Sequence, residues 1–139
     1  MIAAPVPQGD YVPARRSGKL IVTAGMTPRI DGRLAHSGPV RGNPEAEEHR
    51  DAVVLACRNA LTAARSLLQP AEELDAILSM TVYIAAEPGF TAHSRLADHA
   101  SAFLRQELGP AGICSRAAVG VASLPGGAPV EIQLIAMVG

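Results

Sequence analysis

The sequence predicts an α+β fold, a two-layer sandwich in which one mostly antiparallel or mixed sheet carries two helices on one face. Segments with strand character outnumber helical ones, in the order hairpin, small hairpin, helix, strand, helix, strand, strand. Both helical segments have a single apolar stripe, so each helix has one face to bury against a sheet. At 139 residues, the chain is expected to form one domain, 1–139.

The first part of the chain carries the signals of a hairpin. Residues 11–16 and 19–26 have strand character, and the turn dipeptide Ser17-Gly18 separates them. Pro13 restricts the first strand to an edge position or a bulge, and Gly25 interrupts the regular pattern of the second. We therefore expect two paired strands with an irregularity near Gly25.

Turn and cap residues mark the next two elements. Asp31-Gly32, within 28–38, predicts a small hairpin with a tight turn. Asn43-Pro44 predicts the start of a helix, with Asn as the N-cap and Pro at the first helical position. This helix is expected to end before Pro70. Its apolar stripe consists of Val53, Ala56, Cys57, Ala60, Leu61, Ala64, Leu67 and Leu68.

A strand and a second helix follow. Residues 74–86 are rich in β-branched and aromatic side chains, which favours a strand. Phe90 and Thr91 resemble a staple residue and an N-cap, and Gly109-Pro110 ends the helix that they open. One face of this helix carries Leu96, Ala97, Ala100, Phe103, Leu104 and Leu108.

The closing stretch, 114–138, is interpreted as two strands joined by a Pro/Gly-rich turn, which would form a hairpin. The first strand holds a single arginine, Arg116, on a face otherwise lined by small residues. The second holds Glu131, which points away from an apolar face suited to receive the helices. That apolar face consists of Val130, Ile132, Leu134 and Ala136.

Arg116 and Glu131 are the candidate functional pair. A guanidinium binds a carboxylate through two parallel hydrogen bonds, and a glutamate can activate a water or transfer a proton. If both side chains faced one cavity, they would suit a small carboxylate substrate. A structural salt bridge at a subunit interface is the alternative explanation of the pair, and spacing alone leaves both open.

Composition excludes several classes of function. The formal net charge of −1, with basic and acidic residues interspersed, argues against a nucleic-acid partner. No apolar stretch approaches the length of a membrane span, and the first residues lack a signal-peptide pattern. We therefore expect a cytoplasmic protein with Cys57 and Cys114 reduced, Cys57 as a core residue rather than a nucleophile.

The remaining motifs give no site of another kind. The four histidines have no metal-ligand spacing, and no glycine-rich phosphate loop is present. No serine lies in the sequence context of a nucleophile. Neither a metal nor a cofactor is expected.

Two stretches resemble one known family. Ser115-Arg116, followed by the pattern VAxLPxGAPVEIxxIA over 121–136, is similar to the C-terminal signature of the RidA (YjgF-type) reactive-intermediate deaminase family. Asp10-Tyr11-Val12 and the IVTAGMTP run at 21–28 resemble its N-terminal part, and Asn59 also fits. The resemblance covers nearly the whole chain.

The resemblance implies a chorismate-mutase-like fold assembled as a homotrimer, with three pockets between subunits and no cofactor or metal. In the family, an arginine binds the carboxylate of a small 2-imino or enamino acid, and a glutamate positions water for its hydrolysis to a 2-keto acid and ammonia. The matching residues here are Arg116 and Glu131, with Tyr11 and Gly25 lining the pocket. Plain packing for Tyr11 and a simple bulge for Gly25 are the alternatives.

The sequence departs from the family pattern in ways that make the pocket more apolar. The usual SGQ is Ala24-Gly25-Met26, and Ala118 stands where a cysteine often follows the arginine. Cys114 precedes Arg116 by two residues and is expected on the same face, so Ala24, Cys114 and Ala118 are candidate substrate contacts. The leading function is imine deamination. The alternatives are a non-catalytic, regulatory small-carboxylate or metabolite-binding protein and a hydrolase of a related small C–N compound.

Overall fold

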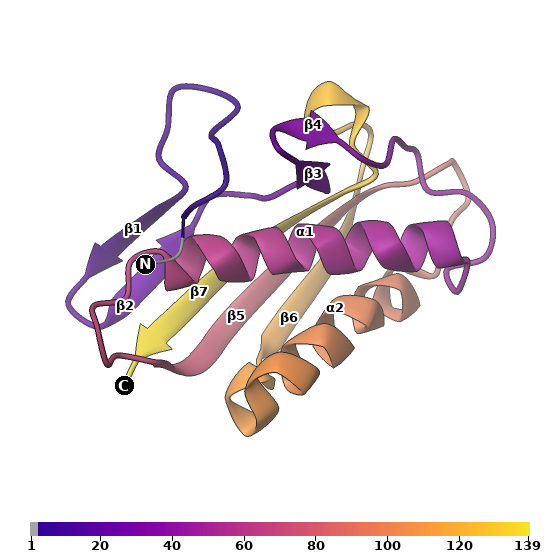
Figure 1. Cartoon of the computed structure of the whole chain (residues 1–139). Coiled ribbons are helices and arrows are strands. Elements are labelled where there is room, and N and C mark those ends of the chain that lie inside the picture. The colour runs from indigo at the N-terminus through magenta and orange to yellow at the C-terminus, as the bar shows by residue number, and fades with distance from the viewer. Residues whose placement is uncertain (1–2) are drawn as a thin grey trace.

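The computed structural model describes residues 3–139 and shows a sheet with two helices on one face (Figure 1). The five strands lie in the order β1-β2-β7-β5-β6. Only β5 and β6 pair in parallel, so the sheet is mixed. The predicted α+β two-layer class is confirmed. The elements are β1 Ala14–Ser17, β2 Leu20–Thr23, β3 Arg29–Ile30, β4 Arg33–Leu34, α1 Glu47–Arg65, β5 Leu74–Ala85, α2 His93–Leu108, β6 Ser115–Val121 and β7 Val130–Val138.

The core lies between the helices and the inner face of the sheet. Both predicted helical stripes are buried along most of their length, and every second residue of β7 is buried as its alternating pattern predicts. The largest fully buried side chains are aliphatic: Ile21, Leu61, Ile77, Met80, Ile84, Leu96, Leu104, Ile132 and Leu134. Within residues 3–139, neither helix is long and apolar enough to cross a membrane.

Both N-terminal hairpins are present. β1 pairs with β2 at the edge of the sheet, where Pro13 immediately before β1 does not interrupt a ladder. β3 and β4 form the small hairpin, and its two turn residues, Asp31 and Gly32, have φ angles of 51° and 78°. Positive φ at both positions is what a two-residue type I′ turn requires, which explains the choice of Asp-Gly.

Both helices begin later than the sequence predicts. Asn43 does not cap α1, because its Oδ1 accepts the backbone N–H of Glu45 at 3.0 Å within a turn that precedes the helix. The helix N-cap is Ala46, which offers no side-chain oxygen. Thr91 likewise is not the cap of α2, whose N-cap is Ala92. At Asn43 the polar side chain satisfies a turn before the helix instead of the first N–H groups of the helix.

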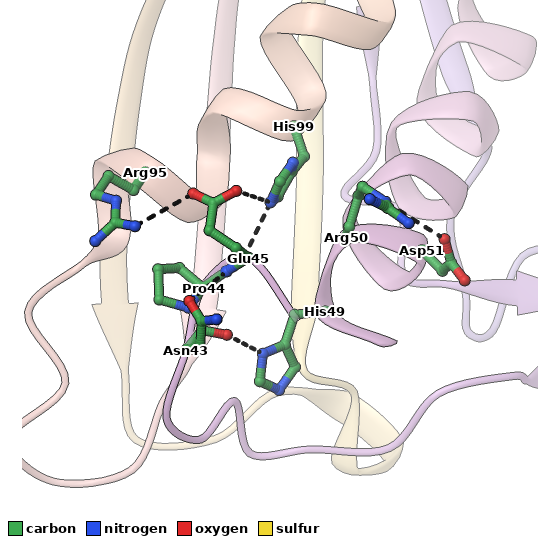
Figure 2. Close-up of polar contacts among 8 residues, drawn as sticks. All are labelled: Asn43, Pro44, Glu45, His49, Arg50, Asp51, Arg95 and His99. Carbon is green, nitrogen blue, oxygen red and sulfur yellow. Dashed lines mark hydrogen bonds and ion pairs between the residues drawn. The ribbon is translucent and has the colours of Figure 1, made fainter. Parts of the chain in front are cut away.

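Contacts from the turn before α1 fasten it to α2 (Figure 2). Glu45 lies 3.4 Å from Nη2 of Arg95 and 3.9 Å from Nε2 of His99. The His99 ring also lies 3.0 Å from the carbonyl oxygen of Pro44, and His49 makes a similar contact, at 3.1 Å, with the carbonyl of Asn43. His49 and His99 therefore contact backbone carbonyl oxygens of the segment that precedes α1.

The predicted closing hairpin is wrong, because β6 and β7 do not pair. β5 lies between them, parallel to β6 and antiparallel to β7. The segment β5-α2-β6 is a crossover unit, in which α2 provides the long connection that a parallel pair needs. Placing β7 between β2 and β5 gives this apolar strand two hydrogen-bonded neighbours and buries it at the centre of the sheet.

Candidate functional site

A β-bulge at the end of β2 sets up the candidate site. Val22 pairs with Ile135, and Met26 then pairs with Ile132, so four steps along one strand face three steps along the other. The extra residue bends the chain at 23–25, the irregularity that Gly25 predicts in the sequence. Met26 restores the ladder through two backbone hydrogen bonds to Ile132, each 2.8 Å long.

Gly25 lies directly against the carboxyl group of Glu131. A Cβ atom at Gly25 would stand 2.5 Å from Oε2 and 2.6 Å from Cδ of Glu131, closer than any real side-chain contact. Only glycine therefore allows the bulge and this glutamate to occupy the same place. Gly25 therefore combines its two sequence interpretations, since it forms a bulge and also a wall of the space around Glu131.

Glu131 opens onto a cavity of about 320 Å³. The side chain is half-buried, and burial raises the pKa of its carboxyl above the ordinary glutamate value. Desolvation favours the neutral form of an acid, so this carboxyl is closer to exchanging a proton near neutral pH than a free glutamate is. The cavity is lined by Gln8, Tyr11, Ala24, Gly25, Thr27, Arg29, Pro125 and Glu131.

Four of the seven residues predicted as site residues line this cavity: Tyr11, Ala24, Gly25 and Glu131. Tyr11 is 45% exposed, so its ring forms part of a wall and is not core packing. Its hydroxyl accepts a 3.0 Å hydrogen bond from the backbone N–H of Gln8, which ties the ring to the N-terminal segment. Ala24 presents a methyl group to the cavity.

Arg116 lies elsewhere in the same chain. It pairs with Met80 of β5, whose buried side chain faces the helices, whereas Glu131 pairs with Tyr83 on the alternate face of β5. Directly paired residues share a face of the sheet, so Arg116 and Glu131 lie on opposite faces. One chain does not bring the two predicted catalytic residues into a common cavity.

The first turns of α2 hold the Arg116 guanidinium. Nη1 donates to Oδ1 of Asp98 and to Oγ of Ser101, both at 2.9 Å. Nη2 donates to the Oγ of Ser94 at 2.8 Å and to its backbone carbonyl at 3.2 Å. The Arg116 guanidinium therefore has a carboxylate partner, Asp98, within its own chain.

The small residues beside Arg116 accommodate α2 and do not leave an open space. Ala118 and Cys114, both predicted as substrate contacts, are partly buried and pack against the core beneath this helix. A Cβ atom at Gly120 would lie 2.6 Å from Nε2 of His93. The strand face that looked cleared of bulk in the sequence is thus the surface on which α2 rests.

Four lining residues were not predicted, namely Gln8, Thr27, Arg29 and Pro125, and Arg29 is the charged one among them. It lines the same cavity as Glu131 and comes from the small hairpin β3-β4. Asn59 of α1 fixes the backbone there, because its Nδ2 donates to the carbonyl oxygens of Thr27 and Arg29 at 3.0 and 2.9 Å. The only sequence signal was indirect: Asp31-Gly32 predicted the turn but not where the hairpin packs.

Cys57 is a core residue, as predicted from its place on the helical stripe. It is fully buried, and desolvation raises the pKa of its thiol to about 12, with a smaller contribution from Cys114. A thiol with so high a pKa is not a nucleophile at neutral pH. Among residues 3–139, no group of three histidine, cysteine or acidic side chains is placed to hold a metal ion.

Comparisons with known proteins agree with this architecture. The family model described as Endoribonuclease L-PSP matches residues 1–138. The chain belongs to this family. The L-PSP family includes the YjgF-type proteins, so the RidA resemblance of the sequence is confirmed.

Three solved structures show how closely the L-PSP fold is shared. Atu1372, a protein with unknown function from Agrobacterium tumefaciens, is 29% identical with a TM-score of 0.85, over 96% of this chain and 86% of that one. The YjgF gene product from E. coli is 22% identical with a TM-score of 0.67, over 96% and 92%. E. coli TdcF with bound serine is 24% identical with a TM-score of 0.67, over 96% and 92%.

Proposed function

We propose that this L-PSP family member hydrolyses small 2-imino and 2-enamino acids to 2-keto acids and ammonia. The observation that carries the proposal is the half-buried Glu131 carboxyl, which opens onto the cavity with its pKa raised by burial. A carboxyl group in this environment can take a proton from water and return it within one reaction cycle. The cavity of about 320 Å³ suits a small ligand.

The reaction needs little beyond a placed water and a proton carrier. As the water oxygen bonds to the carbon of the protonated imine (C=NH2+), one water proton passes to the Glu131 carboxylate and the π electrons move to nitrogen. Glu131 then returns this proton to the nitrogen. The C–N bond breaks and releases ammonia, while the hydroxyl group on the carbon gives its proton to Glu131 and becomes the C=O group. The products are a 2-keto acid and ammonia, and an enamine enters the same path after protonation at its β-carbon. Orientation of water and substrate supplies most of the acceleration.

Arg116 enters the proposal through a second copy of the chain. Arg116, Cys114 and Ala118 lie away from the Glu131 cavity of their own chain, on edge strand β6 or just before it. In the homotrimer implied by the family resemblance, Arg116 would reach the cavity of a neighbouring subunit, while Cys114 and Ala118 stay packed beneath α2. Exposed apolar side chains at Ile113 and Val119 give this edge a surface to bury. The proposal includes a cytoplasmic location.

The related structure of TdcF with bound serine supports a small carboxylate as the ligand class. The family model's description refers to endoribonucleases, but a net charge of −1 with interspersed charges does not favour binding of an RNA backbone. A small acid fits the cavity better than a polyanion does.

Glu131→Gln tests the proposal because it keeps the shape of the side chain and removes its ability to accept a proton. An amino acid oxidase generates 2-iminopropionate in situ, and semicarbazide reports the imine that remains. The wild type should lower semicarbazone formation, and Glu131→Gln should lose on the order of 10²-fold or more of that acceleration. Glu73→Gln, which changes an exposed glutamate outside the cavity, is the matched control. Full activity in Glu131→Gln would refute the proposal.

One observation favours a second candidate, a non-catalytic carboxylate-binding protein with a regulatory role. Ala24 places a methyl group on the cavity wall, and Met26 is buried in the core, so neither supplies a polar contact to a substrate. The same assay separates the two functions. A wild-type protein that binds a 2-keto acid but does not change semicarbazone formation would support the binding protein.

A further inference from the structure

The cavity around Glu131 contains a cation that the proposed function has not used. Arg29 is half-buried, and within residues 3–139 it forms no ion pair. A guanidinium withdrawn from water without an anionic partner is costly, so an anion that binds beside it gains more than at an exposed arginine. Arg16 and Arg116 differ in this respect, because each has a carboxylate partner within its own chain.

Neutral groups hold the Arg29 guanidinium in one orientation. Nε donates to the hydroxyl oxygen of Thr27 at 3.1 Å, and Nη1 donates to the carbonyl oxygen of Gly32 at 3.0 Å. The backbone of the hairpin is itself fixed by Asn59. The fork is therefore positioned before any ligand arrives, and none of the groups that position it neutralises its charge.

The Nη2 group lies against the loop that joins β6 to β7. Figure 1 shows the β3-β4 hairpin beside this loop, which is drawn in yellow. A Cβ atom at Gly126 would be 2.7 Å from Nη2 of Arg29, so a side chain there would displace the guanidinium. Among the described residues, Nη2 donates no hydrogen bond, and its two N–H groups are available to a ligand.

The two acidic groups near Arg29 leave its charge available. Glu131 lines the same cavity, but its pKa is raised rather than lowered, so no ion pair with Arg29 holds it ionised. Asp31 lines an adjoining cavity of about 230 Å³ together with Arg29, and it is exposed to solvent. An incoming carboxylate therefore meets a preoriented and unpaired guanidinium on one wall and Glu131 on another.

We propose that Arg29 binds the carboxylate of the ligand in the Glu131 cavity of its own chain. The identity of the ligand as a small 2-imino or 2-keto acid rests on the proposed function. The carboxylate pairs with the Nη2 side of the fork, which leaves the reacting carbon to face Glu131. Arg29 thus determines specificity for acids over neutral carbonyl compounds from within the chain that carries Glu131.

Pyruvate and its neutral amide, pyruvamide, test this assignment because they match in shape and differ in charge. Binding of each is measured by ligand-observed NMR titration on the wild type, Arg29→Gln, Arg116→Gln and Arg33→Gln. The wild type should prefer pyruvate by about tenfold or more, as a charge-assisted pair predicts. Arg29→Gln should bind the two alike, while Arg33→Gln, an exposed change in the same hairpin outside the cavity, keeps the preference.

Arg29→Lys controls for a merely structural effect of the substitution, because it keeps the positive charge and loses the planar guanidinium. This variant should retain part of the preference for pyruvate over pyruvamide. Equal affinities of the wild type for both probes, or an undiminished preference in Arg29→Gln, would overturn the assignment. So would loss of the preference only in Arg116→Gln. The imine assay tests the proposed function independently of this binding experiment. An Arg29-dependent preference for pyruvate without imine hydrolysis would refute the proposed function and leave this inference standing.

Discussion

Replacing Gly25 by alanine tests how the cavity is built. The new Cβ atom would lie 2.5 Å from Oε2 of Glu131. Non-bonded heavy atoms rest about 3.5 Å apart or more, so the carboxyl group must move by roughly 1 Å. A displacement of this size at a catalytic group costs on the order of 10²-fold in rate, or about 2.7 kcal/mol of transition-state stabilisation.

We therefore expect Gly25→Ala to reduce the acceleration of 2-iminopropionate hydrolysis about a hundredfold, measured by semicarbazone formation. Gly120→Ala is a matched control, because its Cβ atom would approach Nε2 of His93 to 2.6 Å. That crowding is similar, but it occurs under α2 and outside the cavity. Gly120→Ala should keep the rate even where its melting temperature falls.

A double variant links the loss to the carboxyl group of Glu131. Aspartate is one methylene shorter than glutamate, which leaves room for a methyl group at Gly25. The variant Gly25→Ala/Glu131→Asp should therefore be no slower than Glu131→Asp alone, since the two changes act on one contact. Independent, multiplying losses would refute the steric reasoning, and so would a wild-type rate in Gly25→Ala.

Three further predictions concern titratable groups. Because burial raises the pKa of Glu131, its stabilising contribution is present below the ordinary glutamate pKa and lost as pH rises through the raised value. In urea unfolding, the free energy of unfolding of Glu131→Gln should increase relative to that of the wild type as pH rises from the ordinary glutamate pKa through the raised one. A difference that stays constant with pH would contradict this. The hydrogen bonds from Arg16 to Glu72, 2.7 and 2.8 Å long, lower the pKa of Glu72 to about 2. Glu72→Gln should therefore destabilise the fold at neutral pH, with the difference from wild type vanishing as pH falls to about 2; an equal cost at both pH values would count against the pairing. Since Cys57 is fully buried with a pKa of about 12, an aromatic disulfide should label only Cys114 in the native chain and both thiols after unfolding. Equal labelling rates before unfolding would be inconsistent with the burial of Cys57.

Local patterns predicted most of the secondary structure because their causes are local. Asp31-Gly32 adopts the two positive φ angles that its turn requires, and the helical stripes are buried where their spacing places them. The helix starts were the exception. Asn43 and Thr91 are good caps in isolation, but each lies before the N-cap residue of its helix, and the Asn43 side chain bonds within a turn there. A polar side chain near a helix start can satisfy either structure, so the sequence does not decide between them.

The family resemblance and the alternation of β7 correctly indicated Glu131 as a cavity residue. Alternation depends only on neighbouring residues, so the side of the strand that carries Glu131 is already set by the apolar residues beside it. The same argument marked Gly25 as an irregularity, and the structure places it against the Glu131 carboxyl.

The sequence by itself determined the fold class, the core stripes and the half of the cavity lining formed by Tyr11, Ala24, Gly25 and Glu131. Only the tertiary structure decided where the side chains of Arg116 and Arg29 lie. Arg116 faces the helices because β5 lies between β6 and β7, an arrangement that depends on a crossover and not on either strand's own pattern. Arg29 enters the Glu131 cavity because Asn59, 32 and 30 residues from the carbonyls it binds, fixes the hairpin against α1. Contacts over such separations depend on how the whole sheet and its helices pack, which no local pattern contains.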